Sequence, residues 1–201
     1  MKAITLFLIL LLSDFSAAAE YQPQDGDIIF HTSKSNQSLA IRLATNSPFS
    51  HVGIVAKIND QFQVIEAEKG VEVTPLKQWI ERGVDKRFTV KRLKTQLTSE
   101  QITSLKGEIL KKYIGKPYDK YFNWNHDQLY CSELVWVIFN ESPINIQLSA
   151  LRKLKTFNTE DPRVKAKLKE RYGNKIPYDE KVVAPSDIFN SSLLTTAYSP
   201  Q

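Results

Sequence analysis

The sequence predicts an α+β domain in which an antiparallel β-sheet packs against helices. Segments with strand character come first along the chain, and a long helix and then a cysteine-bearing helix follow them. This order lacks the regular alternation of strands and helices that builds a doubly wound parallel sheet, so it favours an antiparallel one. With 201 residues, of which 42% are hydrophobic and 24% charged, the chain is long enough to bury one core.

The first nineteen residues have the pattern of a cleavable export signal. Lys2 precedes a short, almost wholly apolar run at 3–12, and small residues occupy 17–19. This run is too short to cross a bilayer, which needs about 20 residues, whereas all three features are typical of a secretory signal peptide. We therefore expect cleavage after Ala19, a single domain over 20–201, and a periplasmic or secreted mature protein without a membrane segment.

The first half of the mature chain predicts the strands of the sheet. A strand is expected at 26–30, and residues 51–58 and 61–68 should form a hairpin around Asn59-Asp60, because their polarity alternates. The remaining elements expected here are a helix over 38–46, a strand at 71–73, a helix over 75–82 and a strand at 87–93.

The second half predicts helices. Thr98 and Gln101 form a capping-box pattern at the start of a helix that runs to Tyr113. Residues 131–139 are apolar enough for a buried helix that begins at Cys131. A charged helix over 159–172 and a short turn at 185–189 complete the chain.

Cys131 is the only cysteine, so it cannot form a disulfide within the chain. The free backbone N–H groups at a helix N-terminus stabilise a thiolate, and they could also hold an oxyanion if the thiolate attacks an acyl group. Its position before the apolar helix therefore favours a nucleophile over an inert buried cysteine, which remains the alternative.

A thiolate nucleophile needs a base and a group that orients the base. Among the three histidines, His51 is the best candidate because it begins a strand, whereas His31 is expected to pack at a strand end and His126 to be exposed in a loop. A two-residue turn in the hairpin pairs His51 with Glu68 and places Glu66 on the same face. We choose Glu66, which lies between apolar neighbours, and Glu68 remains the alternative.

Composition and spacing disfavour several other functions. The formal net charge is +5, but Lys and Arg are spread along the chain, so nucleic-acid binding is not expected, and anionic envelope material would be attracted only weakly. Neither a metal-ligand spacing nor a phosphate-binding loop is present in the sequence, so we expect no cofactor and no metal.

Five segments in order resemble the bacterial YiiX/YaeF-like family of circularly permuted papain-like proteins, which are related to NlpC-type peptidoglycan amidases. They are Gly26-Asp27-Ile28-Ile29-Phe30, Ser50-His51-Val52-Gly53-Ile54-Val55, Val64-Ile65-Glu66-Ala67, Gly115-Lys116-Pro117-Tyr118-Asp119 and Tyr130-Cys131-Ser132-Glu133-Leu134. The resemblance implies a permuted papain-like (NlpC-type) fold with the histidine before the cysteine. It implies Cys131 as nucleophile, His51 as base and Glu66 as the orienting residue, and it makes Tyr118 a lining or oxyanion-side group.

The expected function is that of an exported cysteine hydrolase that cleaves an amide bond in peptidoglycan stem peptides through a thioester. One alternative is a lipid acyl hydrolase or acyltransferase similar to lecithin:retinol acyltransferase, with an acyl groove lined by the aromatic residues Tyr118, Tyr121, Phe122 and Trp124. The other is a non-catalytic envelope binding protein. The sequence does not indicate an oligomeric state.

Overall fold

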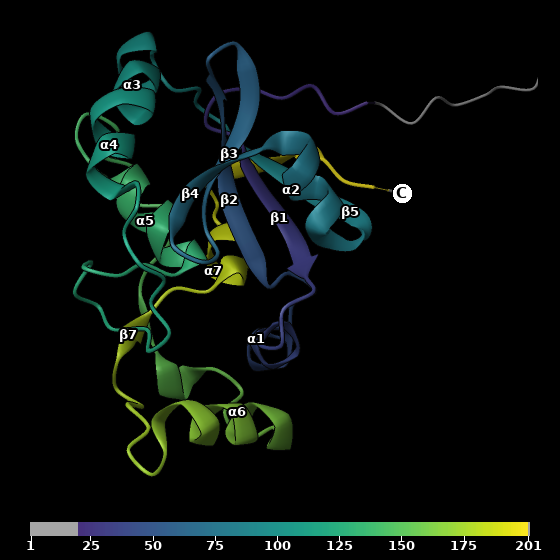
Figure 1. Cartoon of the computed structure of the whole chain (residues 1–201), viewed down its shortest axis with the longest axis vertical. Helices are drawn as coiled ribbons and strands as arrows, with labels where there is room; N and C mark the ends of the chain where they lie inside the picture. The colour runs from purple at the N-terminus through teal and green to yellow at the C-terminus, as the bar shows by residue number, and fades with distance from the viewer. Residues whose placement is uncertain (1–19, 201) are drawn as a thin grey trace, which may run out of the picture.

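The computed structural model describes residues 20–200 and shows a main sheet with helices on both sides (Figure 1). Residues 1–19, where the export signal is expected, and residue 201 lie outside the described part. The main sheet has six strands in the order β4-β3-β2-β1-β5-β8, and every neighbouring pair is antiparallel, as predicted. Its strands are β1 (Ile28–Ser33), β2 (His51–Ile58), β3 (Gln61–Ala67), β4 (Val71–Pro75), β5 (Gly83–Leu93) and β8 (Leu194–Tyr198).

The helices follow the predicted positions closely. Thr98 and Gln101 form the predicted capping box, and the helix they open runs on through a π-helical segment to Tyr113. The helices are α1 (Ser38–Thr45), α2 (Leu76–Arg82), α3 (Ser99–Ser104), η1 (Leu105–Ile109), α4 (Leu110–Tyr113), α5 (Cys131–Asn140), η2 (Leu154–Thr156), α6 (Pro162–Tyr172) and α7 (Pro185–Phe189). Among residues 20–200, no helix is both long and apolar enough to span a membrane.

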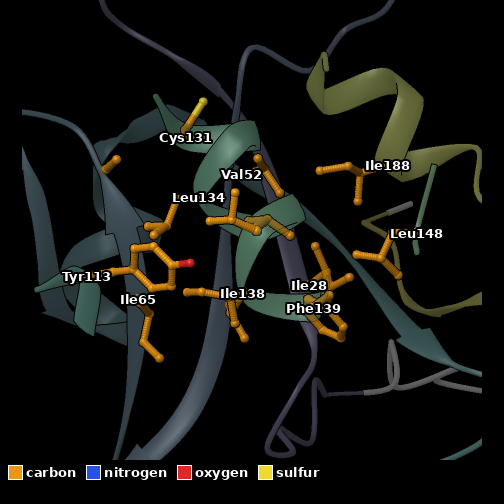
Figure 2. Packing of buried hydrophobic residues seen from close by; sticks show 14 of the residues in the cluster. Ile28, Val52, Ile65, Tyr113, Cys131, Leu134, Ile138, Phe139, Leu148 and Ile188 are labelled. Carbon is orange, nitrogen blue, oxygen red and sulfur yellow. The ribbon is translucent and has the colours of Figure 1, made fainter. Parts of the chain in front are cut away.

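The two faces of the sheet carry different clusters of buried residues. On one face, Ile28, Val52 and Ile65 pack against Leu134 and Ile138 of α5, and this is the larger core (Figure 2). On the other face, a smaller cluster surrounds Trp79 of α2 and consists of Ile29, Val55, Val64 and Val90. The side chains of β1, β2 and β3 therefore alternate between the two clusters.

The hairpin formed by β2 and β3 has the predicted two-residue turn. Asn59 and Asp60 both have positive φ, at 49° and 63°, and Ile58 pairs with Gln61. A turn with two left-handed residues matches the twist of the strands, and Asn and Asp tolerate that backbone. Since Ile54 pairs with Ile65, this register places Glu66 on the same face of the sheet as His51.

Four parts of the structure differ from the prediction. Strand β1 covers Ile28–Ser33 rather than 26–30, because Gly26, with a φ of 86°, belongs to the turn before it. Strand β5 begins at Gly83 rather than at residue 87, and it bends where Asp85 and Lys86 have positive φ. Helix α6 begins at Pro162 rather than at 159, because the Asp161 carboxylate accepts a hydrogen bond from the Arg163 N–H and caps the first turn. Strand β8 and the small β6–β7 pair (Arg152–Lys153 with Lys181–Val182) were not predicted.

Gly53 lets β2 and β3 approach each other beside the candidate site. A Cβ atom at this position would lie 2.4 Å from Val64 Cγ1 and 3.0 Å from the carbonyl oxygen of Ile65. We predict that Gly53→Ala lowers the free energy of unfolding by about 1–3 kcal/mol, because two packed strands must separate. Urea unfolding followed by circular dichroism measures this change.

Gly107→Ala is the matched control for this prediction. Gly107 lies in the helical segment η1, and a Cβ atom there would lie more than 4 Å from every described atom beyond its own stretch of backbone. Alanine should therefore leave the stability unchanged or raise it by up to about 1 kcal/mol. Equal stability of the two variants would show that the contact at Gly53 is not a constraint.

Candidate active site

Cys131 is the first residue of α5, and Tyr130 before it has an extended backbone. Figure 2 shows the sulfur at the start of the helix, above the packed side chains of the core. The residue is only 5% exposed. The thiol therefore lies at a helix N-terminus, where backbone N–H groups are free, and is largely removed from solvent.

His51 connects Cys131 to Glu66. Its Nε2 atom lies 2.6 Å from Glu66 Oε2, and Cys131 is close enough to the ring to raise its pKa. Because Glu66 occupies Nε2, the nitrogen that remains for the thiol is Nδ1. Burial alone would lower the pKa of His51, but the interactions with Cys131 and Glu66 outweigh burial and raise the pKa above its ordinary value.

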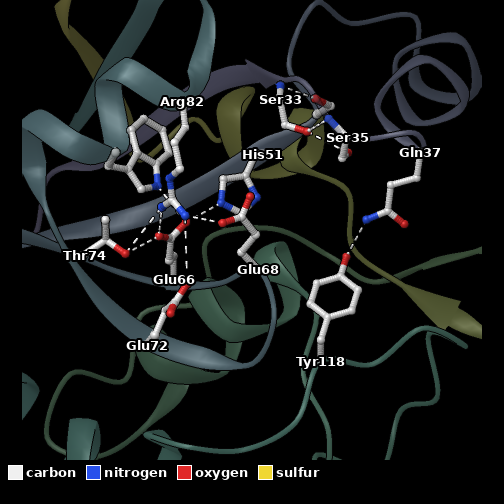
Figure 3. Close-up of polar contacts among 12 residues, drawn as sticks. Ser33, Ser35, Gln37, His51, Glu66, Glu68, Glu72, Thr74, Arg82 and Tyr118 are labelled. Atoms are coloured by element: carbon white, nitrogen blue, oxygen red, sulfur yellow. Dashed lines mark hydrogen bonds and ion pairs between the residues drawn. The ribbon is translucent and has the colours of Figure 1, made fainter.

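Glu66 is fully buried and its carboxylate accepts several hydrogen bonds (Figure 3). Thr74 Oγ1 donates at 2.6 Å, Trp79 Nε1 donates at 2.9 Å, and the Arg82 guanidinium forms an ion pair. Burial raises the pKa of Glu66, but His51, Thr74 and Arg82 outweigh burial and lower the pKa to about 2. The group is therefore a carboxylate at neutral pH.

Glu68, the alternative orienting residue, lies elsewhere. Its carboxylate pairs with Arg82 and not with His51, and its side chain is 39% exposed. The structure thus brings Cys131, His51 and Glu66 together and places Glu68 at the edge of this group. Glu66, Glu68 and Glu72 form an acidic cluster, and the guanidinium of Arg82 contacts all three carboxylates.

His31 stacks between the candidate base and α2. Its ring centroid lies 3.9 Å from that of Trp79 and 5.2 Å from that of His51. Burial, and then the charge of His51, lower the pKa of His31 to about 2, so it is neutral at pH 7. The sequence identified His31 as a packing residue, and its role here is to support the plane of the His51 ring.

Tyr118 lies in the loop that follows α4 and lines the same pocket as Cys131. Its hydroxyl accepts a hydrogen bond from Gln37 Nε2 at 2.9 Å (Figure 3). Burial and the neighbouring Cys131 raise the pKa of Tyr118, so its hydroxyl keeps its proton at neutral pH. The structure therefore places a neutral O–H group near the thiol.

An apolar pocket opens directly beside Cys131. It encloses about 740 Å³, including its open mouth, and lies between α1, α6 and the segment at 182–185. Few polar atoms face it, since Ser132 Oγ donates to the carbonyl of Val183 and the Tyr130 hydroxyl accepts from the N–H of Val183. Its apolar lining includes Ala40, Ile41, Ala44, Phe122, Leu154, Phe157, Val164, Leu168 and Val182.

Two buried carboxyl groups lie behind the site. Asp119 is 1% exposed and accepts a hydrogen bond from the N–H of Tyr121, which holds the loop after Tyr118. Glu133, on the first turn of α5, is fully buried, and one of its oxygens lies 2.9 Å from His126 Nδ1. His126 was expected to be exposed in this loop, and 39% of its side chain is exposed while its ring contacts Glu133.

Four site residues were not predicted from the sequence, and these are Thr74, Trp79, Arg82 and Gln37. Thr74 and Trp79 are separated from Glu66 by only 8 and 13 residues. The sequence carried a partial signal for Trp79. Helix α2 directly follows β4, the third strand of a meander, and such a helix is expected to pack back on that sheet. Gln37 carried no such signal, since it meets Tyr118 across 81 residues.

Comparisons with known proteins agree with this geometry. The family model described as "Permuted papain-like amidase enzyme, YaeF/YiiX, C92 family" matches residues 22–198. The "Uncharacterized protein YiiX" of Escherichia coli K12 is 44% identical over 196 residues, which cover 98% of this chain and 95% of that protein. The crystal structure of "metalloprotein yiiX" from Escherichia coli O157:H7 superposes with a TM-score of 0.86 at 44% identity, covering 90% of this chain and 99% of that chain. The family resemblance and the fold class predicted from the sequence are both confirmed.

Glu133 should make the stability depend on pH. Burial, and then the charge of Asp119, raise the pKa of Glu133 to about 8. Between about pH 4.5 and 8 the folded protein therefore binds a proton that the unfolded chain has lost, so stability falls as pH rises. We predict that the Tm of Glu133→Gln minus the Tm of the unmodified protein increases by at least about 5 °C as the pH rises from 5.5 to 8.5. Each kcal/mol of stability shifts the Tm by roughly 2–4 °C.

This difference cancels the titrating groups that do not contact Glu133, because both proteins contain them. Thermal unfolding at several pH values measures it. Glu108→Gln, which changes an exposed glutamate, should leave the pH profile unaltered. A Glu133→Gln profile parallel to that of the unmodified protein would contradict a proton held at Glu133.

Proposed function

Because this chain belongs to the YaeF/YiiX (C92) family of permuted papain-like amidases, we propose that it is a cysteine hydrolase that cleaves an amide bond through Cys131, His51 and Glu66. The observation that carries this proposal is that His51, hydrogen-bonded to the buried Glu66, also interacts with the thiol at the start of α5. A thiol, an imidazole and an orienting carboxylate in this order are the parts of a cysteine hydrolase site.

The first half of the reaction forms a thioester. The Cys131 thiolate attacks the carbonyl carbon, a C–S bond forms, and the carbonyl oxygen becomes an oxyanion that accepts hydrogen bonds from N–H groups at the start of α5 and from the Tyr118 hydroxyl. When the oxyanion collapses, the C–N bond breaks and the protonated His51 gives its proton to the leaving amine. The raised pKa of His51 keeps this proton available at neutral pH.

The second half releases the acid. The neutral His51 takes a proton from a water molecule, and the resulting hydroxide attacks the thioester carbon. The C–S bond then breaks, which frees the carboxylic acid and restores the thiolate beside a protonated imidazole. Throughout, Glu66 holds Nε2 of the ring in place, so that Nδ1 keeps facing the sulfur.

For the substrate we propose the stem peptides of peptidoglycan, and for the location the periplasm or the cell exterior. The export signal expected at residues 1–19 supports this location, and an amidase family supports an amide substrate. The net charge of +5 favours approach to anionic wall polymers.

The relative described as a metalloprotein raises the question of a cation at the acidic cluster Glu66, Glu68 and Glu72. In this chain the Arg82 guanidinium already pairs with Glu66 and Glu68 and lies 3.9 Å from Glu72. The cluster as it stands therefore does not fit a metal ion, and no step of the proposed reaction uses one.

The apolar pocket favours a second candidate function, the hydrolysis or transfer of a lipid acyl group. Its walls reach from Cys131 to Leu154 and Leu168 and offer almost no hydrogen-bonding partners to a peptide backbone. A buried amide without partners costs roughly 1–3 kcal/mol, whereas each buried methylene of an alkyl chain gains about 0.8 kcal/mol. The pocket therefore suits an aliphatic chain on the acyl side of the scissile bond.

The first test separates these functions. The mature protein, residues 20–201, is incubated with purified peptidoglycan and with envelope lipids, in parallel with Cys131→Ala, and the products are identified by mass spectrometry. We predict new peptide termini only with the intact cysteine. New fatty acids or acyl esters would instead support the second candidate, and no Cys131-dependent product from either material would favour a non-catalytic envelope binding protein.

The same assay tests the orienting residue. Glu66→Gln should lower turnover by about a hundredfold or more, because it removes the charge that holds His51. Glu68→Gln is the matched control and should keep turnover within about threefold, since Glu68 does not contact His51. Equal losses in the two variants would contradict the assignment of Glu66.

The pocket itself can be tested with p-nitrophenyl esters of different chain length. If the pocket binds an acyl chain, kcat/KM should rise at least about tenfold from acetate to octanoate, because each buried methylene contributes up to about 0.8 kcal/mol. Ala44→Phe narrows the pocket from α1 and should remove this preference while leaving the acetate rate unchanged. Ala166→Phe, on the exposed side of α6, is the matched control, and a rate independent of chain length would contradict the second candidate.

A further inference from the structure

A bridge of hydrogen bonds connects Tyr118 to the far end of α6. Arg171 Nη2 donates to Gln37 Oε1 at 2.7 Å, and Gln37 Nε2 donates to the Tyr118 hydroxyl at 2.9 Å. Gln37 lies directly before α1 and Arg171 in the last turn of α6, and 134 residues separate them. The bridge therefore exists only in the folded protein.

The direction of each hydrogen bond in this bridge follows from chemistry. A guanidinium has donors only, so the group of Gln37 that faces Arg171 must be its carbonyl oxygen. The amide NH₂ group of Gln37 must then face Tyr118, and the Tyr118 oxygen must accept. The hydroxyl proton of Tyr118 is consequently directed away from Gln37 and is free to be donated to another group.

Arg171 is itself held in place by the loop that carries Tyr118. Its guanidinium lies 4.3 Å from the ring centroid of Phe122, and the neighbouring Tyr172 hydroxyl donates to the carbonyl of Tyr121 at 2.7 Å. These contacts fix the guanidinium relative to the loop. Arg171 therefore presents its donor to Gln37 in a constant orientation.

We propose that Arg171 and Gln37 are positioning residues, which hold the Tyr118 hydroxyl as a donor to the oxyanion that forms at Cys131. This proposal rests on the proposed function, because it needs an oxyanion at Cys131. Tyr118 and Cys131 line the same pocket, and the charge of Cys131 acts on the Tyr118 hydroxyl. A donor that is already oriented does not have to rearrange when charge develops on the substrate oxygen.

Gln37→Glu is the decisive variant because it keeps the shape of the side chain and reverses its chemistry. One oxygen of the new carboxylate retains the bond to Arg171. The other oxygen can only accept, so the Tyr118 hydroxyl donates its hydrogen bond to this carboxylate instead of to the oxyanion. Acylation of Cys131 is measured with p-nitrophenyl acetate as the release of p-nitrophenolate in a single turnover. We expect the rate to fall by about 10- to 100-fold, as it should in Tyr118→Phe, because one oxyanion donor is lost.

Alkylation by iodoacetamide distinguishes positioning from a merely structural role. Alkylation uses the same sulfur but forms no oxyanion, so loss of an oxyanion donor should not slow it. Gln37→Met removes the hydrogen bonds of Gln37 without adding charge. It should slow acylation several-fold and leave the alkylation rate within about twofold of that of the unmodified protein. In the Tyr118→Phe background, Gln37→Glu should not change the ratio of acylation to alkylation any further. Arg171→Met should slow acylation, and Arg171→Lys, which restores a donor to Gln37 Oε1, should recover most of the rate.

These measurements distinguish failure of the positioning role from failure of the proposed function. Gln61→Glu adds the same charge at the exposed end of β3 and should match the unmodified protein. If Tyr118→Phe is slow but Gln37→Glu is as fast as the unmodified protein, or if their effects multiply in the double variant, the positioning role is wrong. If the unmodified protein shows no Cys131-dependent acylation, the proposed function fails as well.

Discussion

The buried negative charge of Glu66 is the constraint on which the site depends. A carboxylate without solvent is stable in a protein only if other groups neutralise it and satisfy its oxygens. Here β2 supplies His51, β4 supplies Thr74, and α2 supplies Trp79 and Arg82. The position of α2 on the sheet and the orientation of the His51 ring therefore follow from one requirement, which is to compensate this charge.

The site lies where the two faces of the sheet meet. Cys131 belongs to the core on the α5 side, whereas Glu66 lies on the α2 side with Trp79. His51 contacts both because it is the first residue of β2, at the end of the sheet, where a side chain reaches past the strand. A histidine in the middle of the strand would be confined to one face. The location of the base at a strand end is thus required by the placement of the thiol and the carboxylate on opposite sides.

Much of this arrangement could be predicted because it depends on local rules. The Asn59-Asp60 turn determines the hairpin register, and the register puts Glu66 on the face of His51. The start of α5 at Cys131 follows from the apolar run behind it. The contacts that could not be predicted join distant segments: Gln37 meets Arg171 through the packing of α1 on α6. Strand β8 was missed for a related reason, because its mostly exposed residues lack the alternation of a half-buried strand and its identity depends on pairing with β5.

The groups that bond to Glu66 all lie near it in the sequence, and this bears on the order in which the segments of the site can follow one another along the chain. Each of them lies within 16 residues of Glu66, so the half of the site that carries the base is built by contacts inside one continuous segment, 51–82. Closing such short loops costs little conformational entropy, and the segment with the nucleophile joins it through tertiary packing alone. Each half therefore keeps its internal contacts whichever half comes first in the polypeptide. A gene rearrangement that exchanges the two halves leaves this chemistry intact, which gives a physical reason why a papain-like site tolerates having its histidine encoded before its cysteine.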